Sequence, residues 1–123
     1  MLGVGLDLVE IETLALALRR DASCGEAWCT EAELAALGAR ATSADALAGR
    51  VAAKEAIVKA LGVGFAGDVA WQDVEILPRP TGAVDVRLSG GAREAADAMG
   101  VRRVMVSITH TASTAGACAI ALG

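Results

Sequence analysis

Alternation of apolar and polar residues predicts strands near both ends of the chain. In residues 2–9 every second residue from Val4 to Leu8 is a large aliphatic, while glycines and Asp7 occupy the intervening positions. Such a period of two is typical of a β-strand. The same alternation predicts strands at 74–76, 84–88 and 104–108, and an apolar strand at 115–122.

Helical spacing of apolar residues occurs between these strands. It predicts helices over residues 11–20, 31–38 and 46–61, and a short alanine-rich helix between residues 89 and 100. Thr30 and Glu33 form a capping-box pattern, Asp45 is the expected N-cap of the longest helix, and Gly62 is expected to end it. Residues 21–29 and 39–44 are expected to be loops. The sequence therefore predicts one α+β domain, residues 1–123, with a small antiparallel sheet around a central buried helix.

The apolar residues are mostly small. They make up 54% of the chain, but it has only one Phe, two Trp and no Tyr. A core of this kind packs through close backbone approach rather than through large rings. The apolar surplus in so short a chain also indicates that some of these residues are buried against other subunits.

Charge and cysteine usage narrow the functional classes. The net charge of −4 argues against nucleic acid as the main partner, because neutralising its phosphates requires a surplus of Lys and Arg. A small phosphorylated ligand held by a few local cations remains compatible. Three cysteines without a close pair fit neither a disulfide framework nor a zinc site. With no targeting or membrane-spanning segment expected, the sequence predicts a cytoplasmic protein that does not enter membranes.

The central helix carries the first candidate chemistry. Glu55 and Lys59 lie four residues apart on a strip lined by alanines. They either form an ordinary surface ion pair or bind a ligand, since a charged side chain on a buried helix needs an opposite charge or a bound ligand. Asp7 lies on a strand that should be buried. Asp7 and Glu55 either accept hydrogen bonds from nearby backbone or together bind a divalent ion such as Mg²⁺, which typically takes one or two protein carboxylates.

The strand end at residues 106–111 contains the only histidine, His110. A single histidine there has either a structural role or, with the adjacent hydroxyl side chains, a role in binding phosphate.

Three segments together resemble the signature motifs of the holo-acyl carrier protein synthases, the 4'-phosphopantetheinyl transferases of carrier proteins. They read GVGLDLVEI (3–11), AGRVAAKEAIVKALG (48–62) and VSITHT (106–111), in the order and spacing of that family, and WQDVEI (71–76) resembles one of its strands. The resemblance implies the family fold and transfer of the 4'-phosphopantetheine arm of coenzyme A to a serine of an apo acyl carrier protein. Adenosine 3',5'-bisphosphate would be released.

The same resemblance implies site roles. Asp7 and Glu55 match the Mg²⁺ ligands, and Glu55 and Lys59 are the expected catalytic residues. Either Glu55 or a metal-bound water would take the serine proton. The residues expected to bind coenzyme A are Arg50, Lys54, Lys59, Ser107 and His110. The family also implies a homotrimer with active sites between protomers.

One segment departs from the family pattern. Residues 10–13 read EIET, with Thr13 where a basic residue that contacts the carrier is expected. This weakens the expectation of the standard carrier of fatty acid synthesis as partner, and it favours a carrier of a specialised polyketide pathway or one recognised through apolar contacts. Two other functions compete with the transferase: an idle carrier-binding subunit of the same fold, and another Mg²⁺-phosphate enzyme such as a nucleotide hydrolase. The hydrolase lacks support because the glycines at 62–64 follow a helix rather than open one.

Overall fold

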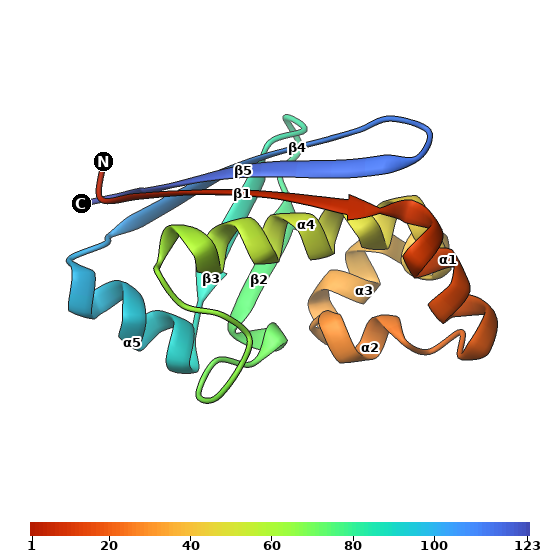
Figure 1. The fold of residues 1–123 in the computed structure, drawn as a ribbon, viewed down its shortest axis with the longest axis horizontal. Coiled ribbons are helices and arrows are strands. Elements are labelled where there is room, and N and C mark those ends of the chain that lie inside the picture. The colour runs from red at the N-terminus through yellow and green to blue at the C-terminus, as the bar shows by residue number, and fades with distance from the viewer.

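A three-stranded antiparallel sheet and one long helix form the centre of the molecule. The computed structural model describes residues 1–123. The strands β1 (Gly3–Glu10), β5 (Thr114–Leu122) and β4 (Arg103–His110) lie in the order β1-β5-β4. Helix α4 (Ala44–Ala60) packs along one face of this sheet, and the two chain ends lie together at one end of it (Figure 1).

The contact between β1 and α4 is unusually close because of glycine. A Cβ atom on Gly3 would lie 2.0 Å from the Ala60 carbonyl oxygen, and one on Gly5 only 1.8 Å from that of Ala56. The buried side chains of α4 are also small, and five of them are alanines: Ala48, Ala52, Ala53, Ala56 and Ala60. The abundance of small residues therefore lets the backbones of β1 and α4 approach closely, as the composition predicted.

Replacing Gly5 by alanine should destabilise the fold by about 3 kcal/mol, because the added methyl group must displace backbone rather than a side chain. Urea unfolding at fixed protein concentration measures this. Gly64→Ala is the matched control, since a Cβ there would meet nothing within 4 Å. Equal stability of the two variants would contradict the close strand–helix contact.

The opposite face of the sheet is apolar and uncovered. Val4, Leu6 and Leu8 are 58%, 64% and 70% exposed, and Met105 of β4 is 46% exposed. Cys118 of β5 is also exposed and lies between Leu6 and Ser107 in the strand register. We call Val4, Leu6, Leu8, Met105 and Cys118 the outer sheet face.

The remaining elements cover the ends and the far side of α4. A separate antiparallel hairpin follows the long helix, and shorter helices lie at both ends of the molecule (Figure 1). These elements are α1 (Ile11–Arg20), α2 (Gly25–Trp28), α3 (Glu31–Leu37), η1 (Gly38–Thr42), η2 (Trp71–Asp73), β2 (Val74–Pro78), β3 (Val84–Leu88) and α5 (Gly90–Met99). No helix combines the length and the apolar character needed to cross a membrane.

The fold prediction is confirmed: the chain forms an α+β structure with an antiparallel sheet packed on a buried central helix. Three local expectations were wrong. The expected loops at 21–29 and 39–44 contain α2 and η1. The N-cap of α4 is Ser43, and Asp45 lies in the first turn, where it accepts a hydrogen bond from the Ser43 hydroxyl. Both hydrogen bonds of the predicted capping box at Thr30 and Glu33 are present.

Candidate functional site

Strand β1 places Asp7 against α4, on the same face as Gly3 and Gly5. The Asp7 side chain is 15% exposed and accepts a hydrogen bond from Lys59 at 2.9 Å between Nζ and Oδ1. Lys59 Nζ also donates to the Leu6 carbonyl oxygen at 3.1 Å. The hydrogen bond to Asp7 and its negative charge both raise the pKa of Lys59. Lys59 is therefore a protonated, half-exposed cation beside a nearly buried carboxylate.

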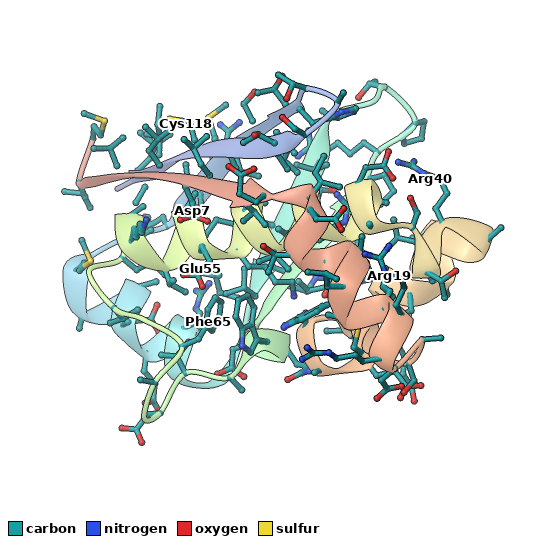
Figure 2. All side chains as sticks on the ribbon, turned by 45° about the vertical axis from the view of Figure 1, so that its right-hand side comes forward. Asp7, Arg19, Arg40, Glu55, Phe65 and Cys118 are labelled. Carbon is teal, nitrogen blue, oxygen red and sulfur yellow. The ribbon has the colours of Figure 1, made fainter.

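Glu55 lies one helical turn before Lys59 and completes a three-residue cluster. Its half-buried carboxylate has no hydrogen bond or ion pair in the structure. Burial raises the pKa of Glu55, and the negative charge of Asp7 raises it further, whereas Lys59 opposes the shift. Figure 2 shows Asp7 on β1 and Glu55 on α4. We call Asp7, Glu55 and Lys59 the acidic cluster.

The acidic cluster suits a hard divalent cation that a phosphorylated ligand helps to bind. A cation would relieve the repulsion between the two carboxylates and give Glu55 the partner it lacks. No group of three or more His, Cys, Asp or Glu side chains is arranged to hold a metal. The two carboxylates, of Asp7 and Glu55, would be enough for Mg²⁺ only if substrate phosphates and water supplied its other ligands.

Lys54 does not lie in the acidic cluster, although the sequence placed it among the coenzyme A-binding residues. Its side chain is 0% exposed. Its ammonium group donates to Glu33 at 2.8 Å, to the Trp71 carbonyl at 3.0 Å and to the Val74 carbonyl. All three donors are used inside the protein, so this geometry is at odds with direct contact to a ligand.

Arg50 lies on the Glu33 side of α4. Burial lowers the pKa of its guanidinium, while the charge of Glu33 raises it. Its Nε atom is buried and has no hydrogen-bond partner. Arg50 is therefore a half-buried cation that the fold itself leaves incompletely satisfied.

Ser107 and His110 lie on β4, which β5 separates from β1. Both residues are exposed, and the His110 Nδ1 atom lies 3.1 Å from the Thr111 carbonyl oxygen. Ser107 aligns with Cys118 and Leu6 across the sheet, beside the outer sheet face. Within one chain, neither residue joins the acidic cluster.

Glu33 is a buried residue whose importance the sequence did not show. Its side chain is 0% exposed. One oxygen, Oε1, accepts hydrogen bonds from the Thr30 amide at 2.9 Å and from Lys54, and Oε2 accepts one from the Ile76 amide at 3.2 Å. The capping-box pattern identified Glu33 as a helix cap but gave no sign of its partners on α4 and β2.

Comparison with known proteins gives a consistent result. The model of the 4'-phosphopantetheinyl transferase superfamily matches residues 3–115. A holo-acyl-carrier-protein synthase of Desulforudis audaxviator is 40% identical over 124 residues, covering 100% of this chain and 94% of that protein. A holo-acyl-carrier-protein synthase of Thermoanaerobacter sp. is 38% identical over 120 residues, which cover 98% of this chain and 86% of that protein. Among solved structures, the Helicobacter pylori holo-acyl-carrier-protein synthase in complex with coenzyme A superposes on this chain with a TM-score of 0.82. The sequence identity is 27%, and the match covers 97% of this chain and 99% of that one.

Proposed function

Because the chain belongs to the 4'-phosphopantetheinyl transferase superfamily, we propose that it works as a holo-acyl-carrier-protein synthase. It transfers the 4'-phosphopantetheine arm of coenzyme A to a serine of an apo acyl carrier protein. We assign this function to Asp7, Glu55 and Lys59, because these three residues come together where β1 packs on α4. The whole chain, residues 1–123, is one catalytic domain in this proposal.

The proposed transfer exchanges one phosphorus–oxygen bond for another. The serine oxygen forms a bond to the phosphorus that carries the pantetheine arm, and the bond from that phosphorus to the bridging oxygen breaks. Adenosine 3',5'-bisphosphate departs with the bridging oxygen. The serine proton passes to Glu55 or to a water beside it. Such a reaction depends mainly on positioning and on neutralising charge.

The acidic cluster supplies these two functions. Asp7 and Glu55 would hold Mg²⁺, which neutralises pyrophosphate charge when it is bound. Lys59 stays protonated beside Asp7 and stabilises the negative charge of the departing bisphosphate. Because Lys59 is half-exposed, its ammonium group can contact a ligand while the Asp7 carboxylate orients it.

The decisive test is intact mass spectrometry of apo carrier proteins incubated with the protein, coenzyme A and Mg²⁺. The panel should include carriers of fatty acid and of polyketide synthesis, because Glu12 pairs with Arg19 at 2.8 Å and leaves only Arg20 as a free basic residue on α1. We expect a gain of one phosphopantetheine arm on at least one carrier. Coenzyme A binding without transfer to any carrier would instead support an idle carrier-binding subunit.

We also propose that the protein is a cytoplasmic homotrimer with active sites between protomers. The outer sheet face supports assembly, since its aliphatic residues are more than half exposed in the single chain. The position of His110 and Ser107, across the sheet from Asp7, supports a site completed by a neighbour. In that arrangement, the neighbour's strand β4 would supply the residues that one chain leaves apart.

Replacing Leu6 by aspartate should disperse this assembly, because it puts a charge in the centre of the apolar interface. Light scattering after size exclusion should give three times 12.4 kDa for the unmodified protein and 12.4 kDa for the variant. Leu16→Asp is the matched control, as Leu16 is 48% exposed on α1, away from the sheet. Trimers that survive Leu6→Asp would contradict the proposed interface.

A further inference from the structure

The loop that follows α4 exposes backbone without partners. Residues 62–70 connect the helix to η2, and two of the glycines, Gly62 and Gly67, have a φ of 72°. The amide groups of residues 64–69 donate to no acceptor in the protein. A Cβ atom on Gly64 or Gly67 would meet nothing within 4 Å, so the backbone at these two glycines is open to a ligand. The loop begins only three residues after Lys59.

An aromatic contact helps to hold this loop, which also packs through Asp68 and Val69 against Gly91 of α5. The Phe65 ring stacks on Trp71 of η2, with 3.9 Å between ring centroids and 16° between ring planes. Phe65 is the only phenylalanine in the chain, and the stack is the one aromatic pair in the structure. Figure 2 labels Phe65 on the loop that descends from α4. Such a pair contributes a modest, directional attraction beyond the burial of its area.

Trp71 is in turn held from inside the protein. Its carbonyl oxygen accepts a hydrogen bond from Lys54 Nζ at 3.0 Å. Lys54 is fixed by the buried Glu33, which also binds the Ile76 amide of β2. A continuous set of contacts thus runs from Glu33 through Lys54 and Trp71 to Phe65, and it ends at the loop that follows Lys59 at the end of α4.

We propose that Lys54 and Phe65 are positioning residues for coenzyme A: through Trp71 they hold the loop of residues 62–70 where its open backbone meets the anionic part of the substrate. This inference rests on the proposed function, because it names what binds at the loop. It gives Lys54 a role in substrate binding without contact, in agreement with its complete burial. Neither residue takes part in the bond-making step.

The first experiment changes the stack and leaves the buried ion pair intact. Phe65→Ala should raise the KM for coenzyme A roughly three- to tenfold, the range expected for the loss of one aromatic pair. The KM for the carrier protein and kcat should stay within twofold of the unmodified values. Phe65→Tyr retains the ring and should restore the KM for coenzyme A. An unchanged KM for coenzyme A in Phe65→Ala would overturn the proposal.

A binding measurement separates this inference from the proposed function. In a Trp28→Phe background Trp71 is the only tryptophan, so its fluorescence reports the stack. Titration of coenzyme A should change that fluorescence, and Phe65→Ala should abolish the change and weaken binding by the same factor as the KM. Binding that is weakened in this way supports the positioning role even if no carrier is modified. A fluorescence change that is equal in both proteins counts against it.

Lys54 needs a variant that still folds. Lys54→Met together with Glu33→Met removes both buried charges and leaves neither unpaired. This double variant should keep its fold by circular dichroism and show the same selective rise in the KM for coenzyme A. A folded double variant with the unmodified KM would show that Lys54 is only structural.

Discussion

Glu55→Gln should lower kcat/KM for carrier modification by roughly 10³-fold, the loss that follows removal of one preorganised charge-stabilising group. Glutamine keeps the size of the side chain but removes the negative charge that Asp7 and Glu55 would share with Mg²⁺. Burial and the charge of Asp7 already raise the pKa of Glu55, so its carboxylate is held in a setting that favours a cationic partner. Mass spectrometry of the carrier over a time course measures the rate.

Glu94→Gln provides the control for this prediction. Glu94 is exposed on α5 and belongs to no ion pair, so its amide variant should modify carriers at the unmodified rate. Calorimetric Mg²⁺ titration in the presence of coenzyme A should show a parallel loss of affinity in Glu55→Gln alone. Activity of Glu55→Gln within tenfold of the unmodified protein would remove Glu55 from the metal site.

Lys54→Met should cost about 3–5 kcal/mol of stability, because it leaves the Glu33 carboxylate buried without its counter-charge. Two backbone carbonyls, of Trp71 and Val74, lose their donor in the same step. Urea unfolding at one protein concentration gives the difference. The double variant with Glu33→Met should recover part of the loss, because no charge stays buried alone, although the Thr30 and Ile76 amides then lack their acceptor.

Lys59→Met is the matched comparison on the same helix. Its ion pair with Asp7 is half-exposed at the lysine, so its loss should lower the stability far less than Lys54→Met does. Lys59→Met should instead lose transfer activity. Equal losses of stability in Lys54→Met and Lys59→Met would contradict a structural role for Lys54 and a ligand-binding role for Lys59.

The sequence predicted the elements whose pattern is local. The alternation in residues 2–9 and the helical spacing up to Gly62 needed no knowledge of distant contacts, and both agree with β1 and α4. The sequence correctly required a cation for the acid on the buried strand, but it paired Lys59 with Glu55, whereas in the structure Lys59 pairs with Asp7.

The missed features depend on contacts between distant segments. Lys54 precedes Glu55 in the sequence, but the 100° rotation between successive helix residues turns it toward Glu33 and β2 rather than toward β1. No periodicity reveals that Glu33, 21 positions earlier, reaches the same point. The helix α2 was missed because four residues are too few for a helical period to show.

The pairing of β1 with β5 has a consequence for how the active centre forms. Asp7 lies opposite Ala117, so the strand that carries this acid finds its partner only 110 positions later. Closing so long a loop is slow compared with forming α4 or the β2–β3 hairpin from neighbouring residues. During synthesis, α4 with Glu55 and Lys59 can therefore fold before β5 is available to pair with β1, the strand that carries Asp7. Asp7 therefore joins Glu55 and Lys59 only when the last strand completes the fold of the chain.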